Sequence, residues 1–481
     1  QIRNSVKKVM NLNKFKKMSL SKASEDVLTE QNIQIMRNSI ISEYLPDQTP
    51  GLERQVQPSR NWIGGFSRQS VLLTPNQTSP TRRSRASTEI EKPRGVITRR
   101  SVREDDQQPL KFDAGFLQIY EDDDKKLKDW SLNVPDIVSD NERSRLVWYM
   151  LEDLGLITEF GIDKQILCGF ILQVKDGYSL HKLPFHNYSH GIQVMHAVHY
   201  MLKHCGFAER FSSVINLGIL IAAFCHDIGH RGKTNLYETN ARSDLAITYH
   251  DRGVLEQFHA AFTFRILSNV NYNILEVLSP EDYKDIRKLI ISCILATDMK
   301  EHFDEVKNLK LLTEGLKQLE GSTEAPHLSK SRKNQTPTEN KQIEWSEDDI
   351  KLITGYIVHA ADLSGQTKAW DLAYYFSCQV NKEFMAQVDE EKALGLPVAP
   401  YMLNLDKPAV MAKAEISFVK FIVKPLWDTF NEFVSDAMKI ASDNLNDNLQ
   451  QWDNAYKNAV QAEEAEKKKA EESKEPESKP Q

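Results

Sequence analysis

The chain has 481 residues, enough for one large domain with extensions or for two to three average domains. Its formal net charge of −7 excludes nucleic-acid binding through a generally basic surface, and its hydrophobic content of 40% is low for a chain folded along its whole length. The five cysteines are scattered without a Cys-x-x-Cys pair, which predicts reduced thiols and a cytoplasmic location. The longest apolar run, at about 214–224, is too short to span a bilayer and predicts a buried helix.

The N-terminal region, residues 1–110, is rich in Arg, Ser, Gln, Asn and Pro and shows little hydrophobic periodicity. We therefore predict that it is basic and largely disordered. Basic serine clusters at 82–87 and 99–101 are candidate sites for regulation by basophilic kinases. The alternatives are a solvated linker, or a segment that tethers the protein to a partner.

Residues 111–460 differ from the N-terminal region in their hydrophobic pattern, because helical periodicity dominates and strand-like alternation is scarce. This pattern predicts a single compact, multi-helix, all-α domain. Polar residues at 321–344 predict an insertion loop between helices. The Lys/Glu-rich tail at 461–481 is predicted to be disordered, with extension of the last helix as the alternative. The clearest helical segments are 144–160, 191–205, 211–224 and 285–296.

Two histidines four residues apart give the first chemical signal. The sequence FHNYSH at 185–190 places His186 and His190 on one face of a helix. Such a pair is more often structural or exposed than metal-binding, so this motif alone is weak.

A His–Asp dipeptide gives a stronger signal. The sequence CHDIGH at 225–230 follows an apolar helix and offers the imidazole of His226 beside the carboxylate of Asp227. Zn²⁺ accepts such mixed nitrogen and oxygen ligands. A buried, charged aspartate needs a partner, and a metal ion would satisfy it. Asp362, in HAADLS at 359–364, adds a second carboxylate after another apolar stretch. With His190 these residues form a candidate metal site that leaves positions open for water.

These motifs resemble those of the class I 3′,5′-cyclic nucleotide phosphodiesterases, within the His–Asp metal phosphohydrolase superfamily. The resemblance covers about residues 112–458 and depends on the order and spacing of several motifs together. They are His-Asn-x-x-His at 186–190, His-Asp-x-x-His at 226–230, Tyr249-x-Asp251-x-x-Val254-Leu255-Glu256, Ala296-Thr297-Asp298-Met299, Ala361-Asp362-Leu363-Ser364, Phe418 and Pro425-Leu426-Trp427.

The resemblance implies an all-α catalytic domain that opens the cyclic phosphodiester ring to give a 5′-nucleoside monophosphate. It implies a first metal, usually Zn²⁺, and a second, usually Mg²⁺ (or Mn²⁺), with Asp227 shared between them. A hydroxide between the two metals would attack phosphorus. The residues that would hold the first metal are His190, His226, Asp227 and Asp362.

The resemblance also implies roles for residues around the metals. His186 would be the general acid that protonates the leaving O3′ atom, and Glu256 would be the carboxylate that keeps it protonated and oriented. His230, Thr297 and Asp298 would organise metal-bound water. For these three residues, ordinary packing of a polar group in a helix is the alternative.

The sequence departs from the family pattern at several positions. Gly229 stands where the family usually has an acidic residue, and Phe258 stands where it has a histidine, although His259 beside it remains. Gly365 replaces a family asparagine near the base. Most importantly, Glu415 replaces the glutamine that binds the purine, while Phe418 matches the aromatic residue that stacks on the base.

The Glu415 substitution predicts a preference for cGMP. An ionised carboxylate only accepts hydrogen bonds, and guanine presents two adjacent donors where adenine presents a donor beside an acceptor. A protonated Glu415 would behave like glutamine, so hydrolysis of cAMP stays open. The sequences PFHN at 184–187 and GLPVAP at 395–400 most resemble the cGMP-selective branch of the family.

Two other functions stay open. One is a different His–Asp phosphohydrolase, such as a nucleotide triphosphohydrolase, which the matches at Glu256, Thr297, Asp298 and Phe418 disfavour. The other is a catalytically weak scaffold, or a structural component tethered for example at a cilium, to which long terminal extensions would be suited.

Overall fold

The computed structural model describes residues 121–321 and 345–472. Contacts divide the chain into two units, Gln1–Gln108 and Pro109–Gln481, and all described residues belong to the second. The predictions for residues 1–110 and for nearly all of the 321–344 loop fall outside the described residues.

The described residues form helices and no strands, which confirms the predicted all-α class. None of these helices is long and apolar enough to cross a membrane. In chain order they are α3 (Glu121–Leu127), α4 (Asp140–Asp153), α5 (Leu156–Phe160), α6 (Lys164–Tyr178), α7 (Tyr188–His204), α8 (Ser213–Cys225), α9 (Asn235–Ala241), α10 (Asp244–Tyr249), α11 (Val254–Leu267), α12 (Pro280–Leu295), α13 (His302–Gly321), α14 (Glu347–Asp362), η4 (Leu363–Thr367), α15 (Trp370–Leu394), η5 (Pro400–Met402), α16 (Pro408–Phe418), η6 (Val419–Val423), α17 (Lys424–Phe433) and α18 (Lys439–Glu472).

Local sequence explains where several helices begin. Ser212 caps α8 by accepting from the backbone N–H of Ile215. Ser279 caps α12 in the same way, and Pro280 follows at the first helical position, where its missing N–H costs nothing. At the start of α14, Ser346 and Asp349 satisfy each other's backbone N–H groups in a capping box.

One predicted helix is two helices. The apolar periodicity predicts a continuous helix over 144–160, but α4 ends at Asp153 and α5 begins at Leu156. Gly155 lies between them with φ of 71°, a left-handed conformation that glycine adopts without steric cost. The apolar periodicity continues through this break, which is why the pattern alone does not reveal it.

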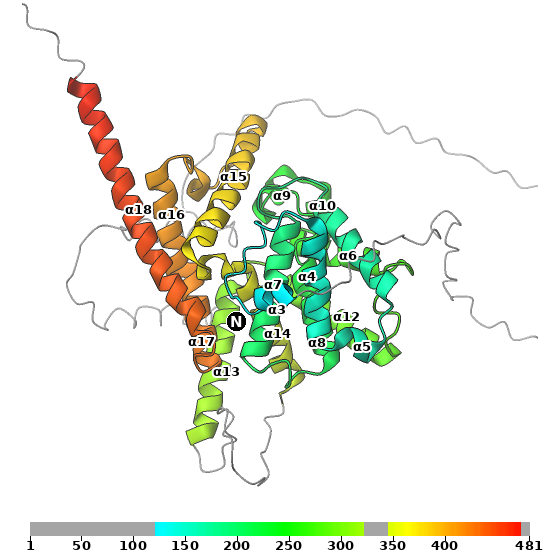
Figure 1. Ribbon diagram of the computed structural model, residues 1–481. Coiled ribbons are helices and arrows are strands. Elements are labelled where there is room, and N and C mark those ends of the chain that lie inside the picture. The colour runs from blue at the N-terminus through cyan, green and yellow to red at the C-terminus, as the bar shows by residue number, and fades with distance from the viewer. Residues whose placement is uncertain (1–120, 322–344, 473–481) are drawn as a thin grey trace, which may run out of the picture. The chain divides into compact units, whose positions relative to one another are not determined.

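The core is centred on α8, whose residues from Asn216 to Cys225 are all buried. Helices α7, α12 and α14 pack against it, and α12 and α14 also contact each other. A second group contains α15, α16 and α18 (Figure 1) together with the short η4 segment. Both α16 and η4 pack against α18. Asp362 at the end of α14 leads directly into η4, so this junction connects the two groups.

The last helix is longer than predicted. α18 runs to Glu472, so the described part of the tail, residues 461–472, is helical and not disordered. This stretch is rich in Ala, Glu and Lys, which are good helix formers, and opposite charges recur at helical spacing. The alternative, extension of the last helix, is therefore correct for these residues.

Candidate active site

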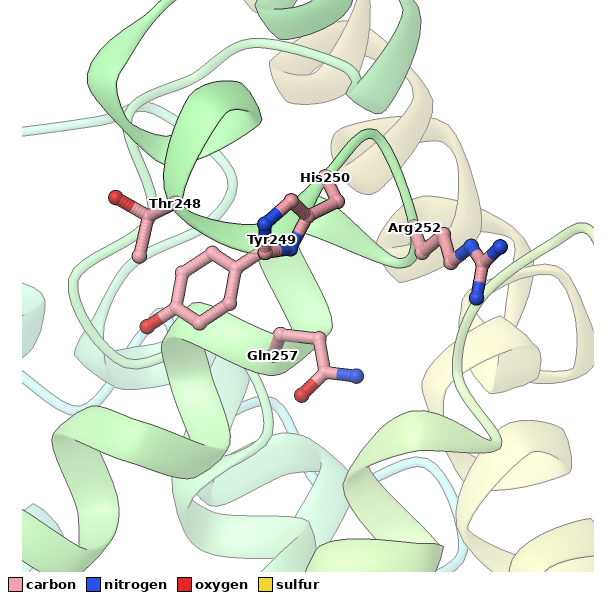
Figure 2. A pocket seen from close by; sticks show the side chains of 5 residues that line it. All are labelled: Thr248, Tyr249, His250, Arg252 and Gln257. Carbon is pink, nitrogen blue, oxygen red and sulfur yellow. The ribbon is translucent and has the colours of Figure 1, made fainter.

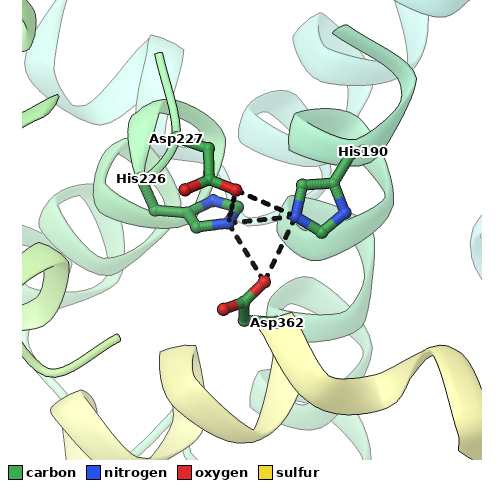
Figure 3. Close-up of side chains that lie close together, drawn as sticks. All are labelled: His190, His226, Asp227 and Asp362. Carbon is green, nitrogen blue, oxygen red and sulfur yellow. Dashed lines mark hydrogen bonds and ion pairs between the residues drawn. The ribbon is translucent and has the colours of Figure 1, made fainter. Parts of the chain in front are cut away.

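Four side chains from three distant parts of the sequence meet at one point. His190 projects from α7, His226 and Asp227 lie in the turn after α8, and Asp362 ends α14 (Figure 3). The Nε2 atoms of His190 and His226 are 3.2 Å apart. Each lies 3.2 Å from Oδ1 of Asp362, and Oδ2 of Asp227 is 3.2 Å from His190 and 3.1 Å from His226.

These separations fit a single metal ion. Donors about 2.0 Å from a zinc ion in a regular tetrahedron are separated by about 3.3 Å. His226 Nδ1 is 2.8 Å from the carbonyl oxygen of Ala223, so Nδ1 carries the proton and Nε2 offers its lone pair to the cluster. Burial opposes the charged forms of Asp227 and Asp362, but the neighbouring imidazoles hold the pKa of both carboxyls below their usual value. The donors are therefore of the right type and charge for a divalent cation.

The turn that carries His226 and Asp227 is held by a buried tyrosine. The hydroxyl of Tyr178 in α6 donates to the carbonyl of Phe224 at 3.0 Å and accepts from the backbone N–H of Asp227 at 3.2 Å. These two backbone groups lie at the end of α8, where helix hydrogen bonds run out. One hydroxyl thus fixes the backbone on both sides of His226.

His186 sits at the edge of the cluster with a carboxylate behind it. Its Nδ1 atom is 2.5 Å from Oε2 of Glu383 in α15, and its Nε2 atom faces Asp227 Oδ2 at 4.0 Å. The other oxygen of Glu383 accepts from the backbone N–H groups of Phe185 (2.7 Å) and His186 (2.9 Å). The ring of His230 stacks on that of His186, with centroids 3.8 Å apart.

The environment favours the protonated form of His186. Burial opposes its charge, but the charge of Glu383 and the hydrogen bond to it outweigh this effect, with further help from Asp227 and Asp362. Together they raise the pKa of His186 to about 9. A charged imidazole directed at the metal-ligand cluster has the right state and position to donate a proton.

The prediction that Glu256 orients His186 is corrected in favour of Glu383. Glu256, at the start of α11, accepts two hydrogen bonds from Asn235 Nδ2, at 3.2 and 3.0 Å. Burial, followed by the charge of Asp298, raises the pKa of Glu256 to about 8. The Glu256 and Asp298 carboxylates each approach Gly253, so they form an acidic pair of their own beside the site.

Of the three predicted water-organising residues, His230 lies close to Asp227, whereas Thr297 bonds to the backbone of its own turn and Asp298 lies beside Glu256. His259 Nε2 faces the second oxygen of Asp227, Oδ1, at 3.6 Å, and His230, His259 and Asp227 form a further group of potential metal donors. His230 Nδ1 accepts from the backbone N–H of Gly232 at 2.9 Å. Thr297 donates its hydroxyl to Ile294, three residues earlier, at 2.8 Å. Asp227 therefore directs its two oxygens to two different groups of ligands.

The substitutions at Gly229 and Phe258 are in contact. Gly229 is buried with φ of 76°, and a Cβ atom there would lie 2.6 Å from the ring of Phe262 and 3.0 Å from that of Phe258. The space that a family acidic side chain would need is filled by these two rings. Two departures from the family pattern are thus one change in packing.

Glu415 and Phe418 both lie on α16, away from the metal ligands in sequence but next to η4. Phe418 is partly exposed, and Glu415 is only 7% exposed. Glu415 Oε2 accepts from Gln366 Nε2 at 3.1 Å. Burial raises the pKa of Glu415 to about 7, whereas a hydrogen bond with Ser377 acts in the opposite direction. The carboxyl group therefore changes charge close to neutral pH.

An open surface pocket of about 530 Å³ lies beside the start of α11. Thr248, Tyr249, His250, Arg252 and Gln257 line it (Figure 2). None of the four clustered metal-ligand candidates is among these residues, so this pocket is separate from the cluster.

Sequence reasoning missed two residues of the site, Glu383 and Gln366. Glu383 is 4% exposed in the middle of α15, and Gln387 and Glu391 are buried on the same helix face. The spacing of these polar residues by four positions, which places them on one face of a helix, is the feature of the sequence that could have identified Glu383. Gln366 stands in η4 directly after Gly365, one of the family departures already noted.

Comparisons with known proteins agree with this geometry. The family model described as 3′5′-cyclic nucleotide phosphodiesterase matches residues 185–445, which is more than half of the chain. The human dual specificity calcium/calmodulin-dependent 3′,5′-cyclic nucleotide phosphodiesterase 1C is 30% identical over 407 residues, covering 82% of this chain and 51% of that protein. The mouse high affinity cGMP-specific 3′,5′-cyclic phosphodiesterase 9A is 32% identical over 289 residues, covering 60% of this chain and 48% of that protein.

A solved structure gives the same result. The phosphodiesterase domain of a rhodopsin phosphodiesterase from Salpingoeca rosetta matches with a TM-score of 0.62 and 29% identity, covering 74% of this chain and 98% of that one. The chain spans about half the length of the curated relatives it matches. With the ordered motifs and the four clustered ligands, these matches show that the chain belongs to the 3′5′-cyclic nucleotide phosphodiesterase family.

Proposed function

We propose that the protein hydrolyses a 3′,5′-cyclic nucleotide to the 5′-nucleoside monophosphate. The observation that carries this proposal is the direction of His186. Its Nδ1 is held by Glu383 while its Nε2 faces the four metal-ligand candidates. A proton donor beside a divalent-cation site is what cleavage of a phosphodiester with an alkoxide leaving group requires.

Each residue then has a defined task. His190, His226, Asp227 and Asp362 would hold a zinc ion, and the second oxygen of Asp227, which faces His259, would serve as a ligand for a second cation, Mg²⁺ or Mn²⁺. When bound, the two cations supply the Lewis acidity that activates water and neutralises the phosphoryl oxygens. His186 gives its proton to the O3′ atom as the bond to phosphorus breaks. Glu383 keeps the imidazole charged and oriented before that transfer.

We further propose cGMP as the preferred substrate, with cAMP as a slower one. Ionised Glu415 would accept from both N1–H and the 2-amino group of guanine, and Phe418 would stack on the base. The cGMP-specific relative supports this choice, whereas the dual specificity relatives support a broader one. The buried position of Glu415 makes a mismatch with adenine costly, at roughly 1–3 kcal/mol.

The test is turnover of cGMP and cAMP side by side with the full chain, Zn²⁺ and Mg²⁺. Hydrolysis of either nucleotide that is lost in Asp362→Ala supports the proposal. Absence of turnover with both nucleotides in a zinc-loaded, folded protein would favour the alternative, a catalytically weak scaffold of the same fold. The cytoplasmic location and regulation or tethering through residues 1–110 stay predictions from the sequence.

A further inference from the structure

We propose that Asn381, on α15 beside Glu415, is a specificity-determining residue whose side-chain amide donates a hydrogen bond to the O6 atom of guanine. This inference rests on the proposed function, and it adds a second contact to the base from a different helix. The observation behind it is a buried hydrogen-bond donor that no other described residue uses.

The Asn381 side chain is buried and incompletely paired. It is only 5% exposed, and its Nδ2 atom has no hydrogen-bond partner among residues 121–321 and 345–472. Most buried polar groups are paired, because an unpaired donor loses its bonds to water without replacement. Asn216 on α8 shows the usual arrangement, since it is equally buried and its Nδ2 donates to the carbonyl of Ala208 at 2.8 Å. Asn381 is thus costly for the free protein, as residues that serve a ligand often are.

Asn381 lies on the part of α15 that borders Glu415. Ser377 precedes it by one helical turn, so the two side chains share a face of the helix. Burial raises the pKa of Glu415 to about 7, and the side chains of Ser377 and Asn381 act in the opposite direction. The pKa of Cys378, in the same turn, is raised mainly by burial and further by the charge of Glu415. These effects place this turn of α15 beside the Glu415 carboxyl group.

The orientation of the Asn381 amide follows from its effect on Glu415. Only the N–H₂ end of an amide stabilises an ionised carboxyl group, because the oxygen end would repel it. Asn381 lowers the pKa of Glu415, so Nδ2 and not Oδ1 is on the Glu415 side. A carboxylate acceptor and an amide donor from two different helices therefore lie next to each other.

This pair of groups complements guanine. Ionised Glu415 would accept from N1–H and the 2-amino group, and the O6 atom beside N1 is an acceptor that the Asn381 amide can serve. Adenine carries an amino group in place of O6. Two donors would then face each other in a buried place, and neither would be paired. Asn381 and Glu415 thus select the same base through different atoms.

Asn381→Leu with two guanine nucleotides tests the inference. Leucine has a similar size and shape but offers no donor. The 6-thio analogue of cGMP keeps N1–H and the 2-amino group but replaces O6 by sulfur, a weak acceptor. In the full chain with Zn²⁺ and Mg²⁺, we expect the ratio of kcat/KM for cGMP to that for the analogue to fall about tenfold, the effect of one buried hydrogen bond. Because the ratio compares two substrates on one protein, partial loss of folded enzyme cancels.

The same substitution in a Glu415→Gln background separates a direct contact from an indirect one. A contact between Asn381 and O6 does not pass through Glu415, so the fall in the ratio should persist. Its disappearance in this background would overturn the inference, because Asn381 would then act only by supporting the charge of Glu415.

Stability gives a second readout, with Asn216→Leu as the matched control. Asn381→Leu removes an unpaired buried group, so the midpoint of chemical denaturation should rise. Asn216→Leu removes a paired one, so its midpoint should fall while its ratio for the two nucleotides equals that of the wild type. An equal fall in Asn381→Leu would show that Nδ2 already has a partner in the free protein, such as an ordered water, and would overturn the inference.

Failure of the inference and failure of the proposed function give different results. A wild type that hydrolyses cGMP, with an unchanged nucleotide ratio in Asn381→Leu, would overturn the inference and leave the proposed function standing. A zinc-loaded, folded wild type without turnover of either cyclic nucleotide would overturn the proposed function, and with it this inference.

Discussion

The carboxylate of Glu383 holds both the ring and the backbone of His186, because one oxygen contacts the ring at Nδ1 while the other accepts from the backbone N–H groups of Phe185 and His186. The same group therefore sets the charge of the imidazole and the direction in which its Nε2 atom points.

Glu383→Gln should move the alkaline limb of the kcat/KM profile to lower pH. His186 donates only when protonated, so its contribution is present below its pKa and is lost as pH rises through it. Glu383 is the main group that raises this pKa, to about 9, against burial. Removing its charge lowers the pKa, and activity is then lost at lower pH. Glu390→Gln, on the same helix but paired with Lys233, should keep the wild-type profile; an identical shift there would contradict the assignment.

His186→Ala should keep both metals but lose on the order of 10²–10⁴ in kcat, the usual scale for a general acid. The loss should shrink for a substrate analogue whose leaving group needs no proton. Metal content and turnover of the two substrates are the measurements. A penalty of the same size on the analogue would mean that His186 serves another purpose, such as binding the phosphate.

Asp362→Ala and Asp227→Ala should each abolish turnover and lower the zinc content of the purified protein. Each removes one oxygen donor from a group in which the donor atoms lie within 4.8 Å of one another. Elemental analysis beside an activity assay checks this expectation. Wild-type zinc and turnover in Asp362→Ala would show that the four side chains do not form the metal site.

The selectivity for cGMP should depend on pH because Glu415 has a pKa of about 7. Above that value the carboxylate is ionised and favours guanine; below it the protonated group resembles glutamine. The ratio of kcat/KM for cGMP to that for cAMP should therefore be larger at about pH 8.5 than at about pH 6. Glu415→Gln removes the titrating group and should give a ratio that does not change with pH. A pH-independent ratio in the wild type would refute the role of Glu415.

Tyr178→Phe should lower both stability and zinc affinity. It leaves the carbonyl of Phe224 and the N–H of Asp227 without their buried partner, at a cost of about 1–3 kcal/mol for each unsatisfied group. Tyr356→Phe is the control, because its hydroxyl also bonds a buried backbone carbonyl, that of Leu426, at 2.7 Å. Both variants should lose stability by chemical denaturation, but only Tyr178→Phe should bind zinc more weakly. Equal zinc affinity in the two would limit Tyr178 to a general structural role.

The amino-acid sequence is most informative where the chemistry is local. His226 and Asp227 are adjacent, so their pairing follows from the sequence alone, and the apolar run before them predicts the buried helix α8. Glu383 cannot be identified in this way, because it lies 197 residues after His186 and only the packing of α15 brings the two side chains together. The sequence motif predicts Glu256 in this role instead of Glu383, because the position of a residue in a motif does not show in which direction its side chain points.

Backbone conformation limits the prediction of elements in a similar way. Apolar spacing passes through Gly155 without interruption, although the chain there takes a left-handed turn that ends α4. The tail has no apolar face and is therefore predicted to be disordered, yet residues 461–472 continue α18 through local helix propensity. Such marginal preferences decide a structure only once a preceding helix provides the nucleus.

The contact between Gly229 and the two aromatic rings restricts which substitutions this chain can accept next. An acidic residue at 229 would meet Phe262 at 2.6 Å and Phe258 at 3.0 Å, and it would also have to adopt a positive φ that favours glycine. Changing Phe258 to histidine first would still leave Phe262 in the way. Position 229 is therefore epistatic with positions 258 and 262: an acidic residue there needs coordinated changes at both aromatic residues, and introduced alone it would give a strained protein.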